Sequence, residues 1–469
     1  MMVAMDLVVR GDIVLPDRVL RDGALGILDG RIAALIQPAQ TAPDAAETLD
    51  IGDALVLAGL VDTHVHCLSS PDEGIARATA AAAAGGVTTV VDMPYDAGSP
   101  VFDRGRLEEK VDAICPEAHV DVGLYGSMAK DGGLQAVPDQ LAAGVLAFKF
   151  SLFETDPQRF PRIRDGDLEA VFELLAPSGV PIVLHCELQE VIERRLDQAS
   201  GRVHRPEAHA ETRPPVSETG AIAKALELAL WTGARVHVAH VTHPHGFRLI
   251  DTYRGLGARV SGETCVQYLA LTEEDVLRLG AIAKVNPPIR DPSCREGLWA
   301  ALERGSIETV STDHAPWPVG LKSKPMLMAA SGVAGLETFL PLMHTEAVKR
   351  GFELPALMEV IAGRPADLFG LRGRKGRLLP GYDADFVVFD PTTQWTFDAS
   401  RSHSSARHSP YEGRELVGRP RATYLRGRPV CANGDVVADP GYGQWLTRDG
   451  CRPGPAARVA QPHHLGTAP

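Results

Sequence analysis

Short apolar runs rich in valine recur along the chain from residue 58 onward. They alternate with stretches rich in alanine, leucine and glutamate, in which the apolar residues follow helical periodicity. This alternation is typical of β-strand and α-helix units that follow one another along a chain. We find eight such runs, at residues 61–66, 86–94, 119–127, 145–152, 181–187, 234–242, 258–265 and 308–316. Eight parallel strands with intervening helices predict a closed (β/α)8 barrel, a TIM-like α/β fold whose chemistry lies at the carboxyl ends of the strands.

The two ends of the chain have a different pattern. Residues 5–57 read as short alternating strands broken by glycine and aspartate turns, and residues 371–440 return to the same strand-and-turn texture. We therefore expect a small β-sandwich domain built from residues 1–57 and 371–440, attached to a catalytic barrel of residues 58–370. Residues 441–469 are rich in proline, glycine, alanine and arginine, and we expect them to form a loose C-terminal tail.

Composition narrows the classes of function. The formal net charge is −13, from 47 basic and 60 acidic side chains, and the sequence has no basic block. Nucleic acid and membrane are therefore not expected as partners. The first residues lack the pattern of a signal peptide, and no apolar run is long enough for a membrane span, so we expect a cytoplasmic protein. Seven cysteines without a CxxC pair favour reduced thiols over a disulfide framework or a cysteine-only zinc site.

Candidate metal ligands fall at matching positions of the predicted strands. His64 and His66 are two residues apart on the first strand, so their side chains leave the same face. Alone, this pair is equally compatible with two satisfied polar residues at a barrel mouth. It gains weight because further candidates lie toward the carboxyl ends of other strands, namely Lys149, His185, His240 and Asp313.

Alternation along two of the strands predicts where the side chains point. Lys149 lies between Phe148 and Phe150, so with the aromatic rings under the helices the lysine points into the barrel. Burial without a partner lowers the pKa of a lysine, and the neutral amine can take up carbon dioxide to form a carbamate. The alternative is a lysine paired with an acid. On the sixth strand, alternation predicts that His240 faces the site and that His237 fills space between strand and helix.

Four imidazoles, one possible carbamate and one carboxylate suit a pair of divalent ions, most naturally two zinc ions about 3.5 to 4 Å apart. Such a pair lowers the pKa of a bridging water from about 15.7 to about 7 and polarises the carbonyl under attack. Asp313 would then orient the hydroxide, take its proton and deliver it to the leaving nitrogen. Proton transfer of this kind typically contributes ~10² to 10⁴-fold.

Several segments together resemble the cyclic amidohydrolase branch of the metal-dependent amidohydrolase superfamily, which contains hydantoinases (dihydropyrimidinases), allantoinases and dihydroorotases. The similarity covers nearly the whole chain, in the segments GLVDTHVH, AAAAGGVTTVVDMP, FKF, HCE, ETRPP, VAHVT, GETCVQYLAL, VNPPIR, STDHAP, GVAGLETFLPL and KGRLLPGYDADFVVFDP. The resemblance implies a β-sandwich plus barrel, a binuclear zinc site and hydrolysis of a cyclic amide. It assigns as metal ligands His64, His66, carboxylated Lys149, His185, His240 and Asp313, and it makes Asp313 the general base and acid.

The resemblance also implies substrate contacts at Asn286 and Ser331. Dihydroorotase-like sequences carry an arginine two residues after the second histidine and an asparagine after DMP, and here these positions are Leu68 and Tyr95. Losing that guanidinium removes a strong bidentate contact to the substrate carboxylate. Hydantoinase-like sequences place a substrate-binding tyrosine five residues after the lysine, where this chain has Glu154. The stretches VVDMP and HCE favour an allantoinase-like substrate.

These observations predict a zinc-dependent hydrolase that opens the ring of a neutral cyclic ureide, allantoin-like or hydantoin-like. The alternatives are a dihydroorotase-like enzyme, a one-metal deaminase of the same superfamily, and a non-catalytic scaffold protein on the same fold. A scaffold relative would lack the metal ligands, whereas all six candidates are present here. Relatives are commonly dimers or tetramers, so we expect a homodimer or homotetramer acting on a small molecule.

Overall fold

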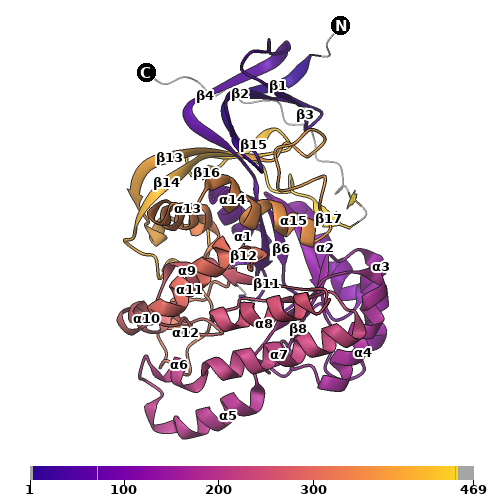
Figure 1. Cartoon of the computed structure of the whole chain (residues 1–469), viewed down its shortest axis with the longest axis vertical. Helices are drawn as coiled ribbons and strands as arrows, with labels where there is room; N and C mark the ends of the chain where they lie inside the picture. Colours follow the sequence, from indigo (N-terminus) through magenta and orange to yellow (C-terminus); the bar gives the residue numbers. More distant parts are fainter. Residues whose placement is uncertain (1–3, 71, 449, 453–469) are drawn as a thin grey trace.

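The computed structural model describes residues 4–70, 72–448 and 450–452 of the chain. A barrel of parallel strands forms its centre (Figure 1). The strands are β5 (Leu60–Val65), β6 (Val87–Asp92), β7 (Asp121–Gly126), β8 (Ala147–Ser151), β9 (Ile182–His185), β10 (Val236–Val238), β11 (Val260–Cys265) and β12 (Thr309–Ser311). They pair in chain order, and a bridge between Val65 and His314 joins the last strand to the first. Each of the eight predicted runs overlaps one of these strands, so the (β/α)8 barrel is confirmed.

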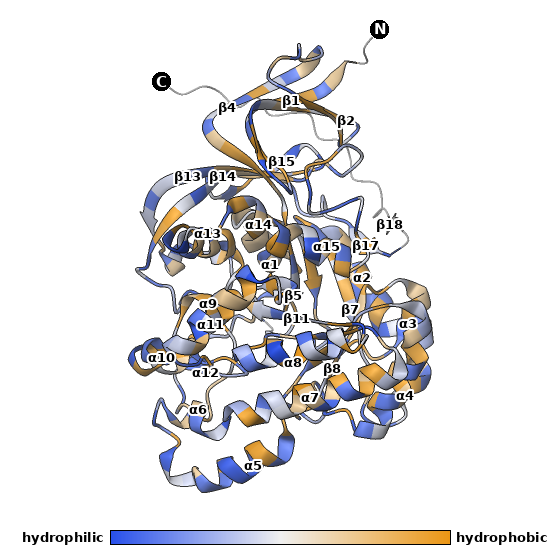
Figure 2. Ribbon diagram, viewed as in Figure 1, coloured by the Kyte–Doolittle hydropathy of each residue, from blue (hydrophilic) through white to orange (hydrophobic). Residues whose placement is uncertain are grey.

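Helices cover the outside of the barrel between successive strands (Figure 1). The longer ones are α1 (Gly74–Ala84), α2 (Arg104–Glu117), α3 (Val137–Ala143), α4 (Asp165–Leu175), α7 (Pro215–Thr232), α8 (Pro244–Gly255), α11 (Pro292–Glu303) and α13 (Phe339–Arg350). Shorter or outlying ones are α5 (Gln189–Gln198), α6 (Ala208–Thr212), α9 (Val266–Ala270), α10 (Glu273–Leu279), α12 (Val319–Lys322), α14 (Leu354–Met358) and α15 (Arg364–Leu368). Helix α5, mostly blue in Figure 2, buries only Ile192. In the part of the chain that is described, no helix combines the length and apolar character needed to cross a bilayer.

Apolar side chains fill the barrel below the polar end of the strands. Val91, Tyr125, Ala147 and Val183 belong to a buried cluster that also contains Phe369, from the chain just after α15. The rings of Tyr125 and Phe369 meet edge to face at 5.7 Å. Because this half of the interior is close-packed, the polar side chains gather at the carboxyl ends of the strands.

Both ends of the chain contribute to one mixed sheet, at the top of Figure 1. Its strands are β1 (Met5–Val14), β2 (Val19–Leu28), β3 (Arg31–Ile36), β4 (Ala45–Ala58), β13 (Phe386–Thr396), β14 (Glu415–Leu425), β15 (Arg428–Ala432) and β16 (Asp435–Val436). The two ends meet where β4 and β13 pair antiparallel, with Val56 opposite Val388. The expectation of one β unit made from both chain ends is therefore confirmed.

The segment expected to be a loose tail begins as part of the barrel sheet. Strand β17 (Trp445–Thr447) pairs in parallel with β7, with Trp445 opposite Val122, on the stretch of β7 that β8 leaves free. Gly443 allows this close approach, because a Cβ there would lie 2.0 Å from the carbonyl oxygen of Val120. Strand β18 (Gly450–Arg452) follows antiparallel to β17. Residues 453–469 of the expected tail lie outside the described residues.

Candidate metal centre

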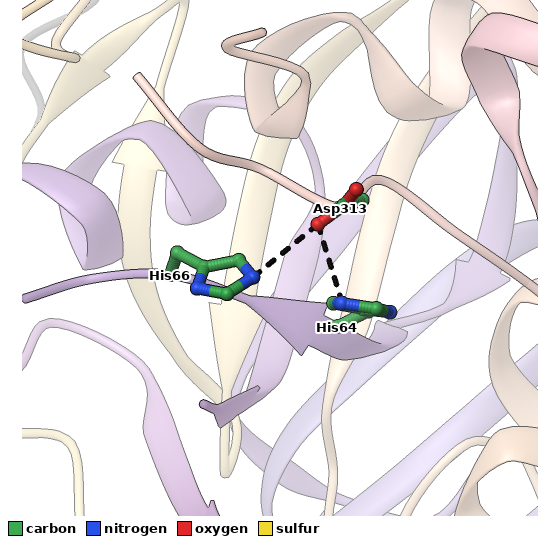
Figure 3. Close-up of side chains that lie close together, drawn as sticks. All are labelled: His64, His66 and Asp313. Carbon is green, nitrogen blue, oxygen red and sulfur yellow. Dashed lines mark ion pairs between the residues drawn. The ribbon is translucent and has the colours of Figure 1, made fainter. Parts of the chain in front are cut away.

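His64, His66 and Asp313 point toward one another at the carboxyl end of the barrel (Figure 3). His64 lies in β5, His66 follows that strand, and Asp313 follows β12. The Oδ1 atom of Asp313 is 3.2 Å from Nε2 of His64 and 3.4 Å from Nε2 of His66. The three ligand atoms lie within 4.8 Å of one another. Two imidazole nitrogens and one carboxylate oxygen at this spacing can bind one divalent ion.

A second pair of imidazoles adjoins the first. His185 ends β9 and His240 follows β10, and Nδ1 of His185 lies 2.9 Å from Nε2 of His240. The ring of His240 is also 5.3 Å from the ring of His64, measured between centroids. The four histidines from three strands therefore form one continuous group of nitrogen donors.

Lys149 of β8 is 1% exposed, and its charge acts on two members of this group, His64 and His240. Its Nζ atom has no hydrogen-bond partner among the described residues. Burial lowers the pKa of Lys149, although Glu263 and Asp313 act in the opposite direction. Among the described residues no acid forms an ion pair with Lys149, so the alternative of a lysine directly paired with an acid does not apply.

Two carboxylates that the sequence analysis did not single out hydrogen-bond ring nitrogens of the candidate ligands. Glu263 of β11 hydrogen-bonds Nδ1 of His64 and accepts from the backbone N of His240 at 3.2 Å. Glu187 hydrogen-bonds Nε2 of His185 at 2.8 Å and forms an ion pair with Arg213. Each contact fixes one ring nitrogen or backbone position so that the other ring nitrogen faces the site. The signal in the sequence was an acid within a buried strand segment, in GETC and HCE.

The pKa values of these two glutamates follow from their partners. Burial raises the pKa of Glu187, but Arg213 and His185 outweigh it and bring that pKa to about 2. Burial likewise raises the pKa of Glu263. His64 and His237 outweigh this effect and hold the pKa of Glu263 well below its ordinary value. Both carboxylates are therefore ionised near neutral pH and can orient a neutral or metal-bound imidazole.

His240 and Asp313 adopt left-handed backbone conformations, with φ values of 39° and 46°. Such a conformation costs ~1 to 3 kcal/mol for a residue other than glycine and persists only where the surroundings enforce it. Around Asp313, the hydroxyl of Thr312 donates to Asp62 at 2.6 Å and accepts from the backbone N of His314 at 3.0 Å. The local strain therefore coincides with two candidate ligands.

The same backbone conformation overturns the alternation expected on the sixth strand. Strand β10 ends at Val238, so strict alternation does not extend to His240. His237 points into the barrel, where its ring nitrogens meet Ser261 Oγ at 2.8 Å and Thr309 Oγ1 at 3.3 Å. The prediction that His237 fills space between strand and helix is wrong. His240 reaches the site because the chain turns after the strand.

The two residues predicted to contact substrate lie in neighbouring loops. Asn286 is half-buried, and its Oδ1 atom is buried without a hydrogen-bond partner among the described residues. Ser331 is half-buried, and its carbonyl oxygen accepts from Nε1 of Trp317 at 2.9 Å. An unpaired amide oxygen in one loop is an acceptor available to a ring N–H group.

Two buried lysines tie these loops together. Nζ of Lys322 donates to the carbonyl oxygens of Lys284 at 3.0 Å and of Gly332 at 2.8 Å. Nζ of Lys284 donates to the carbonyl oxygen of Ala329 at 2.6 Å. Burial lowers the pKa of each lysine to about 7. The spacing of the two substrate loops therefore depends on side chains that sequence reasoning did not single out.

Leu68, Tyr95 and Glu154, the three positions that differ from the dihydroorotase-like or hydantoinase-like pattern, contact other residues of the chain. Leu68 is half-buried against the core, and the hydroxyl of buried Tyr95 donates to the carbonyl oxygen of Lys149 at 3.2 Å. Glu154 forms an ion pair with Lys130. The ring of Phe160 stacks on Tyr95 at 3.6 Å and lies 6.0 Å from the ring of His185. An aromatic wall from two loops thus stands beside the candidate ligands.

A second group of acids has metal-like spacing but a different environment. Asp121, Asp383 and Asp385 surround Nζ of Lys375, at 2.5, 3.0 and 2.7 Å respectively. Arg426 adds a further contact to Asp121 at 2.7 Å. The protein's own cations occupy this cluster, so it is an ion-pair network and not a metal site.

Comparison with known proteins places the chain in a family. A model described as the amidohydrolase family matches residues 55–430. The chain is 34% identical over 431 residues to an L-hydantoinase of Paenarthrobacter aurescens, covering 90% of this chain and 93% of that protein. It is 34% identical over 444 residues to an allantoinase of Deinococcus radiodurans, covering 93% and 98%.

Structural comparison agrees with these matches. The L-hydantoinase (dihydropyrimidinase) from Arthrobacter aurescens superposes with a TM-score of 0.91 at 33% identity, covering 94% of this chain and all of that one. The resemblance drawn from the sequence is thereby confirmed. The chain belongs to the metal-dependent amidohydrolase family.

Proposed function

We propose that this chain hydrolyses the C–N bond of a cyclic amide and opens the ring of a neutral cyclic ureide, allantoin-like or hydantoin-like. The observation that carries the proposal is the buried Nζ of Lys149, which has no hydrogen-bond partner among the described residues and lies near His64, His240 and Asp313. Relatives named L-hydantoinase and allantoinase support this class of substrate. A scaffold protein would have no need of such a costly set of buried polar groups.

The donor set fits two zinc ions. Nitrogen donors from four histidines and an oxygen donor from Asp313 match the ligand preferences of zinc. The 2.9 Å separation of the facing nitrogens of His185 and His240 suits two ligands of one ion. Carboxylation of Lys149 would supply the shared oxygen ligand. Burial lowers the pKa of Lys149, and this favours the neutral amine, which is the form that reacts with carbon dioxide.

When bound, the ions would lower the pKa of a water molecule to about 7 and polarise the substrate carbonyl. The residues of the chain would orient and move the proton. Asp313, between Nε2 of His64 and Nε2 of His66, is positioned to accept a proton from the attacking water and to donate it to the leaving nitrogen. His64 and His66 counteract the effect of burial and keep the pKa of Asp313 below its ordinary value, so it starts as the base.

Substrate recognition would come from the two neighbouring loops. The unpaired Oδ1 of Asn286 can accept from a ring N–H group, and the Ser331 loop can contact the opposite amide edge. The aromatic wall of Tyr95 and Phe160 can exclude water from the same space. These contacts suit a flat ring with alternating N–H and C=O groups.

The test is a substrate panel assayed with zinc-loaded protein for ring opening, consisting of allantoin, hydantoin, 5-substituted hydantoins, dihydrouracil and dihydroorotate. We expect ring opening of allantoin or a hydantoin. Elemental analysis should find two zinc ions per subunit. One metal per subunit with release of ammonia would point instead to the deaminase alternative. A flat response across the whole panel would contradict ureide hydrolysis.

Assembly as a homodimer or homotetramer is also part of this proposal. It derives from the resemblance to relatives that are commonly oligomers, and the net charge of −13 does not oppose it. Light scattering on the purified protein would distinguish one, two and four copies. A strictly monomeric protein would contradict the proposed assembly and leave the proposed chemistry unaffected.

A further inference from the structure

Arg159 lies where three loops at the carboxyl end of the barrel meet. It belongs to the loop after β8, and its Nη1 atom donates to the carbonyl oxygen of Ser69, in the loop after β5, at 3.2 Å. Its Cζ atom lies 5.7 Å from the ring centroid of Trp317, in the loop after β12. The next residue, Phe160, has its ring 6.0 Å from that of His185. The guanidinium is thus at the mouth of the candidate site.

The contacts of Ser69 and Trp317 connect this guanidinium to the site itself. Oγ of Ser69 hydrogen-bonds Nδ1 of His66 at 2.9 Å. Nε1 of Trp317 donates to the carbonyl oxygen of Ser331, the predicted substrate contact, at 2.9 Å. Arg159 therefore lies between a candidate metal ligand and a candidate substrate loop.

Arg159 forms no ion pair within the described part of the chain, and the carboxylate of Asp156 interacts with its charge only from beyond ion-pair distance. The residue is half-buried, and its Nε atom is buried without a hydrogen bond to any described residue. Asp156, in the same loop, uses its carboxylate for the backbone N atoms of Gln158 at 2.9 Å and Arg159 at 2.8 Å. By contrast, Arg162 in this loop forms an ion pair with Glu190 at 2.7 Å. A half-buried guanidinium that forms no ion pair can still bind an anionic ligand directly.

We propose that Arg159 recognises a carboxylate on the substituent of the substrate ring. The side of its guanidinium that carries Nε and Nη2 makes no hydrogen bond to a described residue, and this planar edge matches the two oxygens of a carboxylate. The ring of Trp317 beside it reduces access of water, which strengthens such a contact. The substrate class is then a cyclic ureide whose neutral ring carries an acidic side chain.

This inference rests on the proposed function and narrows it. Leu68 occupies the position where dihydroorotase-like sequences carry their carboxylate-binding arginine. Arg159 contacts the adjacent residue, Ser69, so a different loop brings a guanidinium to the same side of the mouth. The loss of the arginine at position 68 therefore does not remove recognition of an acid.

The test compares hydantoin-5-acetate with its neutral isostere hydantoin-5-acetamide, each as separate enantiomers, on zinc-loaded wild-type protein, R159Q and R162Q. We expect wild type to favour the acetate in kcat/KM by ~10 to 100-fold, the range of a hydrogen-bonded charge contact. R159Q should lose this preference, so its ratio of kcat/KM for the acetate to kcat/KM for the acetamide should fall toward one, whatever its overall rate. R162Q, the matched control, should behave as wild type.

Binding of both compounds, measured by calorimetry, separates this inference from the proposed function. Ring opening without a preference for the acetate, or a preference that R159Q retains, overturns the role of Arg159 and leaves the ureide hydrolase intact. Acetate binding that depends on Arg159 without any ring opening supports the anion contact and overturns the hydrolase. Absence of both binding and turnover overturns both.

Discussion

The barrel carries two buried clusters of ionisable side chains, one at each end, and they differ in what neutralises their charge. At the amino end, Asp121 begins β7 and meets Lys375 at 2.5 Å, with Arg426 at 2.7 Å. At the carboxyl end, Lys149 has no hydrogen-bond partner among the residues that the structure describes, and the imidazoles of His185 and His240 face one another. Ligand spacing alone marks both clusters as possible metal sites, one with two histidines and an aspartate and the other with three aspartates. They differ in their donor atoms and in the lysine and arginine that contact the three aspartates.

The two buried lysines make the contrast plain. Burial lowers the pKa of both, but the three aspartates around Lys375 reverse the effect and hold its pKa well above its ordinary value. The acids near Lys149 do not reverse it, and its pKa stays low. A lysine is a structural cation when acids contact it directly and a reactive amine when they stand further away.

Replacing Lys149 with alanine should have the largest effect on function. Without the carbamate the two ions lose their shared ligand, so we expect a protein short of zinc, with turnover reduced by ~10⁴-fold or more. Short-chain carboxylates added to the medium should restore part of both. Elemental analysis and a ring-opening assay measure the outcome, and a variant that binds two zinc ions unaided would refute the carbamate.

Replacing Lys375 with methionine should affect stability and not metal content. Removing the cation leaves buried carboxylates unpaired, a change that typically costs ~3 to 5 kcal/mol. Urea unfolding gives the loss, and elemental analysis should still find the wild-type zinc content. The control is Lys349→Met, because Lys349 is 57% exposed in its ion pair with Glu346, and its loss should cost less than about 1 kcal/mol. Equal zinc loss in K375M and K149A would erase the distinction between the clusters.

Replacing Asp313 with asparagine tests proton transfer at the carboxyl-end cluster. The amide keeps the shape and an oxygen donor but cannot take a proton, so we expect folding and much of the metal to remain while kcat falls at least ~100-fold. Zinc analysis and circular dichroism serve as controls for site and fold. Near-normal turnover would remove Asp313 from the role of base.

The smallest effect concerns acid stability at the amino-end cluster. Burial raises the pKa of Asp121, but Arg426 and Lys375 outweigh it and lower that pKa from 3.8 to about 2. Its contribution to stability is therefore complete above about pH 4 and is lost as the pH falls through about 2, a change of order 2 kcal/mol. Unfolding curves at pH 5, 4 and 3 should show a shallower pH dependence in D121N than in wild type, and identical slopes would contradict this assignment.

Most of the barrel could be predicted because parallel strands are buried on both faces and read as apolar runs. The same runs locate the carboxyl ends of the strands, and hence the level at which His64, Lys149 and His185 stand. Strand alternation placed Lys149 inside because β8 stays regular through Ser151. Local pattern is sufficient wherever the backbone remains regular.

Irregular backbone and long-range partners escaped prediction. His240 is aimed by a left-handed residue beyond the end of β10, which alternation cannot describe. Glu263 reaches His64 across 199 positions of sequence, and Arg159 reaches Ser69 across 90. Such contacts form only when the barrel closes, so no local sequence pattern predicts them. The pairing of β17 with β7 escaped for the same reason.

That pairing sets an order of events during synthesis. The backbone N of Val122 donates to the carbonyl oxygen of Gln444 at 2.9 Å, and the backbone N of Gln444 donates to Asp121 at 2.9 Å. More than 300 residues separate the two strands, so the first half of β7 keeps an exposed edge until residues 445–447 have been synthesised. A nonsense codon or protease cut before residue 445 would leave that edge bare in an otherwise translated barrel, and such truncated chains would be prone to aggregate.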